Sequence, residues 1–336
     1  MRTDLKIIRD QNTKKKLEES ELARGRTLDN FNKVLELNQI VIKIKKTLDC
    51  LNEKINQNHK KIKQCKLAKE DIPTLTLAEN TELEIRKKIC NQDYKDSHQK
   101  LKYKFNLLAN IADPIFTTEV HSIKSLKLNP RLTHSRLIEK QLVLTQFLSF
   151  FHKQGYELIQ TPSIGLNSLL RKVFPTKRFA QVSSKKKHKL LLPDPIYAII
   201  PSYFKEKLSK VPLKLACYGT YFNYKLQQSE IFSLILLIDG QNSQAFEEAL
   251  ITDTLALLNS YFPSLLQFNR PAKSLSQHAS HQIDFAIQSS PEEYTKICTF
   301  TNYSTYLSHK AQIQLTNKEP ARILSVRIKN FFLFLK

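Results

Sequence analysis

The sequence predicts an α+β protein in which a long N-terminal antiparallel helical hairpin precedes an antiparallel sheet with flanking helices. An apolar repeat near the N-terminus keeps helical spacing over several turns, and the later chain alternates short apolar strands with amphipathic helices. The pattern changes at Ala112-Asp113-Pro114, where helical periodicity stops. We therefore expect a coiled-coil arm at 1–112 and a second domain at 113–336.

The apolar repeat has the spacing of a coiled-coil seam. Its steps alternate between three and four residues, which keeps one stripe of side chains facing a partner helix. After a break at Asp71-Ile72-Pro73, a less regular apolar row runs from Leu83 to Leu108, so the partner is expected in the same chain. The outgoing helix, from Leu28 to Lys66, would be about 55 to 60 Å long. The seam residues are Val34, Leu37, Val41, Ile44, Leu48, Leu51, Ile55, Asn58, Ile62 and Cys65.

The second domain is expected to combine helices with antiparallel strands. A core helix is predicted from Leu132 to Lys153, followed by a glycine turn and a strand that ends at Pro162. Two strands, at 214–222 and 231–239, should pair as a hairpin. A further helix is predicted at 246–258 and a further strand at 283–287.

Composition favours a nucleic-acid partner. The chain has 336 residues and a hydrophobic share of 41%, which is normal for a folded protein. Its 53 lysines and arginines exceed its 31 acidic residues, and the formal net charge of +22 attracts polyanions. The sequence has no apolar run of the roughly 18 residues that a spanning helix requires, so we expect no membrane insertion.

Basic residues off the seam are the candidate nucleic-acid contacts. Lysines on a coiled coil can be merely its solvated face, but the charge of the whole chain favours binding. The candidates are Lys43, Lys46, Lys54, Lys60, Lys61, Lys63, Lys66, Arg86, Lys87 and Lys88.

No metal site is expected. The five cysteines form no Cys-x-x-Cys pair, which indicates a reducing compartment. His278 and His281 have a metal-like spacing, but they lie in a polar stretch without a convincing third ligand, so we expect them to be solvated. With only 5 glycines, a Gly-rich phosphate loop is nearly excluded.

In this order, the segments resemble a seryl-tRNA synthetase, a class II aminoacyl-tRNA synthetase. Residues 4–10 resemble the first helix of that family, and residues 107–114 resemble the end of its tRNA-binding hairpin. Residues 147–162 are similar to motif 1, which forms the dimer interface in the family, and residues 211–222 resemble the core around motif 2. The resemblance covers nearly the whole chain and implies a tRNA-binding arm on a class II synthetase core.

The functional positions of the family are replaced. Its motif 2 reads Phe-Arg-x-Glu, in which the arginine binds an ATP phosphate and the glutamate helps to hold the adenine, but this chain has Phe222-Asn223-Tyr224-Lys225. The Thr-x-Glu that binds serine corresponds to Asp194-Pro195-Ile196, and a glutamate at an ATP or metal position corresponds to Lys296. Only Asn302 keeps the pattern of that last segment. The degenerate positions are Asp194, Ile196, Asn223, Lys225 and Lys296, and no catalytic residue is expected.

Motif 3 of the family, a glycine-rich strand and helix with an ATP-binding arginine, has no counterpart visible after Pro320. We therefore expect a core truncated before motif 3, with a central strand missing. Losing one positioned electrostatic contact costs about 10²- to 10³-fold in rate, so the combined losses should abolish turnover. No cofactor is expected, since only an active ligase would use ATP and Mg²⁺.

With its active-site positions replaced and its arm kept, the sequence resembles the noncatalytic mitochondrial seryl-tRNA synthetase-like paralogues of insects. This resemblance implies a mitochondrial pseudoenzyme, although the chain shows no clear presequence. It also implies binding to RNA, with tRNA as the first candidate, and a homodimer or a heterodimer with a catalytic seryl-tRNA synthetase. Two alternatives stay open: a divergent active serine-tRNA ligase, and a nucleic-acid-binding assembly factor.

Overall fold

The computed structural model describes residues 8, 10–68, 74–112, 123–125, 134–174, 179–182, 189–290 and 293–329. The chain divides into two compact units, which we describe separately. The arm unit is Arg26–Leu108, and the core unit combines Met1–Gly25 with Ala109–Lys336. This division differs from the boundary expected at residue 112, because the segment up to Gly25 belongs to the core unit and the arm unit ends at Leu108.

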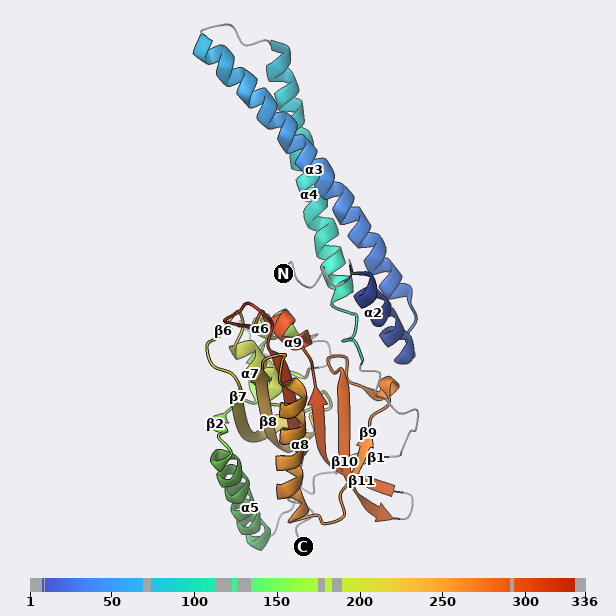
Figure 1. Ribbon diagram of the computed structural model, residues 1–336, viewed down its shortest axis with the longest axis vertical. Coiled ribbons are helices and arrows are strands. Elements are labelled where there is room, and N and C mark those ends of the chain that lie inside the picture. Colours follow the sequence, from blue (N-terminus) through green and yellow to red (C-terminus); the bar gives the residue numbers. More distant parts are fainter. Residues whose placement is uncertain are drawn as a thin grey trace. The chain divides into compact units, whose positions relative to one another are not determined.

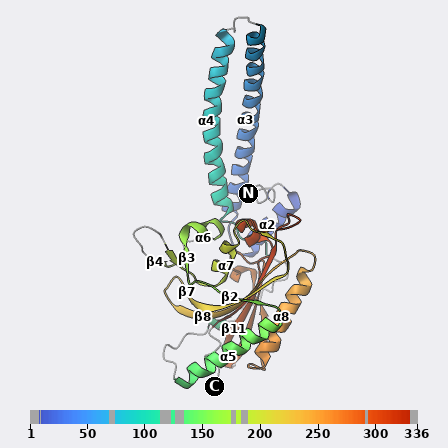
Figure 2. The same ribbon diagram turned by 90° about the vertical axis from the view of Figure 1, so that its left-hand side faces the viewer.

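The arm unit is an antiparallel helical hairpin, as predicted. Its helices α3 (Asp29–Ala68) and α4 (Thr74–Phe105) pack along their length (Figure 2). The seam faces inwards, with Val34 fully buried and Ile55 2% exposed. The thiol of Cys90 donates a hydrogen bond across the hairpin to the carbonyl of Ile44 at 3.8 Å. The break predicted at 71–73 lies outside the described residues.

Helix α2 (Gln11–Ala23) is bonded to the segment where the chain re-enters the core unit. The carboxylate of Glu21 accepts a hydrogen bond from the amide of Ala109 at 2.9 Å. The guanidinium of Arg24 donates to the carbonyl of Asn110 at 3.0 Å. Because these bonds bridge residues far apart in sequence, they attach residues 10–25 to the core unit rather than to the hairpin that follows them directly.

An eight-stranded mixed sheet forms the centre of the described core unit (Figure 1). Its order is β2-β7-β8-β13-β11-β10-β9, with β1 beside β11. The pairs β1 with β11 and β2 with β7 are parallel, and the other neighbours are antiparallel. The strands are β1 (Ile123–Ser125), β2 (Glu157–Gln160), β7 (Leu213–Phe222), β8 (Gln228–Ile238), β9 (Leu266–Asn269), β10 (His281–Ser290), β11 (Glu293–Asn302) and β13 (Arg322–Lys329).

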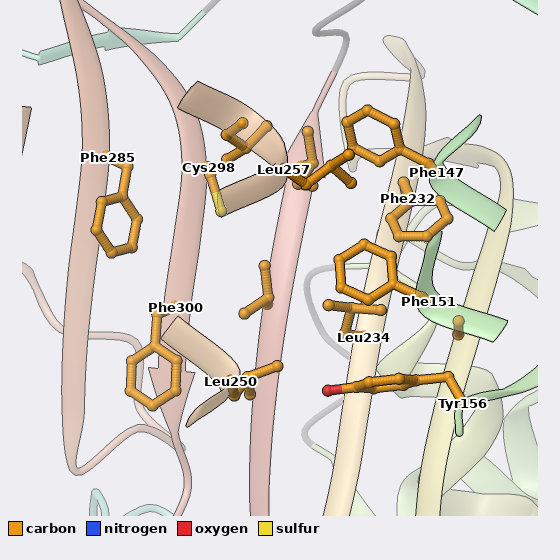
Figure 3. Close-up of a cluster of buried hydrophobic side chains, with 14 of the residues drawn as sticks. Phe147, Phe151, Tyr156, Phe232, Leu234, Leu250, Leu257, Phe285, Cys298 and Phe300 are labelled. Carbon is orange, nitrogen blue, oxygen red and sulfur yellow. The ribbon is translucent and has the colours of Figure 1, made fainter. Parts of the chain in front are cut away.

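Two longer helices cover one face of this sheet, α5 (His134–Lys153) and α8 (Ser243–Asn259). Their apolar side chains meet those of the strands in an aromatic core (Figure 3). The ring of Phe232 lies 5.4 Å from that of Phe147 and 5.6 Å from that of Phe151, and all three side chains are fully buried. Aromatic contacts of this kind add stability beyond the area that they bury.

Three short helices cover the other face, together with two small accessory sheets. Along β8, Phe232 and Leu234 enter the first core, whereas Ile231 and Ile235 enter the second, as the two-residue period of a strand requires. The remaining elements are β3 (Ile164–Leu166), α6 (Asn167–Val173), β4 (Gln181–Val182), β5 (Lys189–Leu191), α7 (Ile196–Ser202), β6 (Lys207–Leu208), η2 (Ala272–Ser274), α9 (Tyr306–Ala311) and β12 (Gln314–Leu315).

The predicted strand hairpin is confirmed as β7 and β8, and the predicted helices as α5 and α8. The expectation of a missing central strand is wrong. Strand β13 pairs with β8 on one side and with β11 on the other, at the centre of the sheet. Its Leu324, Val326 and Ile328 are buried in the aromatic core. A central strand needs side chains that alternate between the two faces of the sheet and are buried on both. Arg322–Lys329 can meet this requirement without the glycines of motif 3.

Candidate functional site

Two of the degenerate positions, Asn223 and Lys296, meet at one small cavity, which we call the strand-edge cavity. It lies where the β7–β8 turn, β11 and β13 come together, and its volume is about 100 Å³. Its polar lining is formed by Asn223, Ser229, Lys296, Thr299, Arg327 and Lys329.

Asp194 is held in an ion pair beside this cavity. Its carboxylate accepts a hydrogen bond from the amide of Ile196 at 3.0 Å and another from the guanidinium of Arg327 at 3.1 Å. Burial alone would lower the pKa of Arg327, but Asp194 and Tyr303 raise it above its ordinary value. Asp194 therefore joins the start of α7 to β13, which makes it a structural link.

Two of the other degenerate positions, Asn223 and Ile196, are used in folding. The side-chain oxygen of Asn223 accepts hydrogen bonds from the amides of Lys225 and Gln227, at 2.9 and 3.0 Å, and so closes the turn between β7 and β8. Ile196 is buried in the second core. Lys225 is exposed and does not line the cavity. The structure therefore brings Asn223 and Lys296 to one cavity, with Asp194 beside them, but it does not bring Ile196 or Lys225 there.

Asp284 on β10 is the centre of a second ion-pair group. The guanidinium of Arg270 donates to its two oxygens, with a shortest separation of 2.5 Å, and the hydroxyl of Thr299 donates at 2.8 Å. The amine of Lys296 lies 3.6 Å away. Burial would raise the pKa of Asp284, but Lys296, Arg270 and the hydrogen bonds lower it overall. Asp284 therefore stays ionised and compensates the cations around it.

Lys296 remains partly uncompensated. Burial lowers the pKa of Lys296 to about 8. Asp284 acts in the opposite direction, but the nearby charges of Arg270 and Arg327 lower the pKa further. Lys329 lies on β13, two residues after Arg327, so both side chains are on the same face of the strand. Burial and the charge of Arg327 also lower the pKa of Lys329. The cavity is therefore strongly electropositive.

The two histidines are not solvated as expected. His278 is 8% exposed and stacks against Tyr306, and burial lowers its pKa to about 3. His281 begins β10, and its Nδ1 lies 3.4 Å from the carboxylate of Glu247. Among the residues that the structure describes, no three histidine, cysteine or acidic side chains lie together as metal ligands would.

The candidate nucleic-acid residues all lie on the helices of the arm unit. Lys87 is half-buried, and Arg86 is exposed but pairs with Glu82 at 2.5 Å. The side chain of Lys66 lies outside the described residues. The remaining candidates are exposed: Lys43, Lys46, Lys54, Lys60, Lys61, Lys63 and Lys88.

No helix in the described parts of either unit is long and apolar enough to cross a bilayer.

No protein-family model matches this chain, and no curated protein sequence matches it. Solved structures do match. The prolyl-tRNA synthetase of Giardia lamblia in complex with prolyl-adenylate aligns over 58% of this chain and 45% of its own length, with a TM-score of 0.51 and 13% identity. Together with the sheet order and the flanking helices, this likeness indicates an aminoacyl-tRNA synthetase-like core.

Two seryl-tRNA synthetases align over almost the whole chain, including the arm. The cytoplasmic serine-tRNA ligase of Naegleria fowleri, solved with AMP, has a TM-score of 0.77 and 14% identity and covers 95% of this chain and 88% of its own. The Pyrococcus horikoshii enzyme, solved with ATP, has a TM-score of 0.82 and 13% identity and covers 98% and 92%. The chain thus has a class II seryl-tRNA synthetase-like fold.

The residues at the strand-edge cavity do not fit Mg·ATP. Drug-sized ligands occupy pockets of about 300 Å³ or more, and this cavity has about 100 Å³. Magnesium requires oxygen ligands, and none of the residues that line the described cavity is acidic. The described cavity is lined instead by the cations Lys296, Arg327 and Lys329, and the carboxylates of Asp194 and Asp284 beside it are held in ion pairs.

Sequence analysis missed four residues of this site: Arg270, Asp284, Arg327 and Lys329. Asp284 lies in a predicted strand, but nothing local indicates its arginine partner on the preceding segment. The alternation from Arg322 to Lys329 is the one signal that could have placed the two cations of β13 on one face.

Proposed function

We propose that this protein is a noncatalytic seryl-tRNA synthetase-like protein that acts by binding RNA, with tRNA as the first candidate, and by pairing with a second synthetase-like subunit. The observation that carries the proposal is the strand-edge cavity. In it, Lys296 stands where the resemblance places a glutamate, none of the described lining residues is acidic, and the volume of about 100 Å³ is below that of pockets for drug-sized ligands.

The loss of catalysis follows from charge as well as from volume. Phosphoryl and acyl chemistry on ATP depends on metal ions and on preorganised electrostatics. Here Asp284 is occupied by Arg270, and Asp194 by Arg327. A carboxylate already held in this way has to give up a buried cation before it can bind a metal ion, which is costly.

RNA binding is supported by the arm. Its exposed lysines are spread along α3, so a polyanion could contact several of them at once. The seam is buried between the two helices, and the lysines lie on the exposed side of α3. The fold alone does not assign a ligand, and the charge on this surface is the argument for RNA.

Pairing is supported by exposed apolar side chains on α5 and β2. Three leucine and isoleucine side chains of α5 and one of β2 are exposed, at 44 to 60%. Surfaces of this kind are typical of protein interfaces. We propose that this surface pairs either two copies of the chain or the chain with a catalytic seryl-tRNA synthetase. The residues are Leu137, Ile138, Leu142 and Leu158.

We propose a mitochondrial location on the strength of the resemblance to the mitochondrial paralogues. Fractionation of cells that express the untagged full-length protein tests it, with antibodies against matrix and cytosolic markers as controls. Recovery of the protein in the cytosol alone would contradict it.

An ATP–pyrophosphate exchange assay with serine tests the loss of catalysis, with an active seryl-tRNA synthetase as the positive control. We expect no serine-dependent exchange above background. Clear exchange would instead establish the divergent ligase.

An RNA-binding titration tests the role of the arm. Reversing the charge at Lys60, Lys61 and Lys63 to glutamate should weaken binding and reduce the salt slope, by about 0.9 per lost phosphate contact on duplex and about 0.7 on single strands. The matched control reverses the charge of three exposed lysines of the core unit, Lys207, Lys210 and Lys318. Equal losses in both variants would mean that net charge, and not the arm, determines binding.

A further inference from the structure

The strand-edge cavity has a charge imbalance that the ion pairs around it do not remove. Three cationic side chains line it, Lys296, Arg327 and Lys329, and its described lining contains no acidic residue. Like charges held close together in a partly desolvated site repel one another and destabilise the fold unless an anion lies between them.

The carboxylates beside the cavity are already used. Asp284 holds Arg270 at 2.5 Å and leaves Lys296 at 3.6 Å, and Asp194 accepts from a single nitrogen of Arg327. Arginine carries five N–H donors, so Arg327 keeps donors for a further acceptor. Lys296 likewise keeps donor capacity.

We propose that this cavity binds one tetrahedral oxyanion of the size of inorganic phosphate, held by Lys296, Arg327 and Lys329. The volume agrees with this ligand. A cavity of about 100 Å³ is several times the roughly 10 to 15 Å³ that a cavity needs to hold one water molecule, so it has room for a five-atom oxyanion. The hydroxyl of Ser229 adds a neutral donor on the β8 side.

The electrostatics of the site support the same ligand. Burial lowers the pKa of both Lys296 and Lys329 below their ordinary values, and the charge of Arg327 adds to this effect. A bound anion would favour the charged form of both lysines. Charge-assisted hydrogen bonds from lysine and arginine to a phosphate oxygen are among the stronger polar contacts in proteins.

The phosphate group could belong to a free ion or to a nucleotide. The volume favours the free ion, since the cavity is smaller than the pockets of about 300 Å³ or more that hold drug-sized ligands. This site goes beyond the RNA-binding role proposed for the arm and does not depend on it, so the two proposals can fail separately.

Calorimetric titration of the full-length protein with sodium phosphate at low ionic strength tests the proposal. We expect one saturable site. Lys296→Gln and Lys329→Gln should each weaken phosphate binding by about tenfold or more, since each removes a charge-assisted contact. Lys329→Arg keeps the charge and should keep the binding. Lys225→Gln, on the exposed turn outside the cavity, is the matched control and should bind as the unsubstituted protein does.

Circular dichroism of each variant shows that the fold is kept. A second titration adds ATP and then AMP before phosphate, and we expect neither to reduce phosphate binding. The proposal is overturned if no saturable site is found, or if the two glutamine variants bind phosphate as tightly as the unsubstituted protein. It is equally overturned if ATP displaces phosphate at lower concentrations than phosphate itself requires, because the cavity would then be a nucleotide site.

Discussion

Substitution of Asp284 by asparagine removes the carboxylate that compensates the charges of Arg270 and Lys296. The side chain of Asp284 is 6% exposed and that of Arg270 is 16% exposed, so the pair is almost dry. Removing one partner of a buried pair costs about 3 to 5 kcal/mol, since the other charge is left without compensation. We expect a loss near 3 kcal/mol, because the slight exposure of Arg270 lets water reach it. The ratio of folded to unfolded protein would fall more than a hundredfold.

Urea unfolding measures this loss. The chain has no tryptophan and 12 tyrosines, so near-ultraviolet circular dichroism of tyrosine reports on the core unit, which contains most of them. Glu206→Gln is the matched control, since it removes the same charge from an exposed position of the same unit, and its effect should stay within about 0.5 kcal/mol. A second substitution, Lys296→Met in the Asp284→Asn background, should recover part of the stability. The reasoning is refuted if Asp284→Asn unfolds at the same urea concentration as the control.

Three further predictions concern pH, the arm and the sheet. Burial, with the charges of Lys310 and Arg24, lowers the pKa of His278 to about 3. The imidazole therefore stays neutral in the folded protein, whereas in the unfolded chain it takes up a proton below pH 6.5. Stability should therefore fall by up to about 1.4 kcal/mol per pH unit as the pH drops from 6.5 towards 3, and urea midpoints of His278→Phe should lack this part of the slope. The buried side-chain amide nitrogen of Asn58 has no hydrogen-bond partner among the described residues, and such a group destabilises the fold by about 1 to 3 kcal/mol. Asn58→Leu removes this group, so it should stabilise the hairpin and slow the hydrogen exchange of backbone amides in α3 and α4. Phe232→Ala should lower the free energy of unfolding by about 3 to 5 kcal/mol, measured in the same urea titration.

Each of these predictions has its own contrary outcome. Equal pH slopes in the histidine variant and the unsubstituted protein would show that other groups determine the acid sensitivity. Faster exchange in the asparagine variant would mean that Asn58 fixes the register of the hairpin and that leucine allows it to slip. A loss below about 1 kcal/mol for Phe232→Ala would mean that the aromatic core can close around the missing ring.

The helical hairpin could be predicted because its information is local. A seam with steps of three and four residues needs only one neighbouring helix, and that helix, α4, is the next described element of the chain. The strand hairpin of β7 and β8 was predictable for the same reason, since its partners follow one another. The boundary after Gly25 was not, because the bonds that attach α2 to the core unit join residues more than eighty positions apart.

The site was predicted in part. The resemblance brought Asn223 and Lys296 together, and the structure places both at one cavity. The pair of Arg327 with Asp194 was not predictable, because the two residues lie 133 positions apart in the sequence. An ion pair between a side chain of β13 and one at the start of α7 depends on the register of the whole sheet. No short sequence pattern encodes that register.

The position of β13 has a consequence for synthesis of the chain on the ribosome. This strand follows both of its neighbours, β8 and β11, in the sequence, yet it lies between them in the sheet. Until β13 emerges, β7–β8 and β9–β10–β11 are two separate ribbons, each with an unpaired edge of the kind that promotes aggregation. The sheet of the nascent chain can therefore form completely only after its last described strand has been synthesised. Before that point, the two ribbons expose unpaired strand edges, and chaperones that bind such edges would have their largest effect.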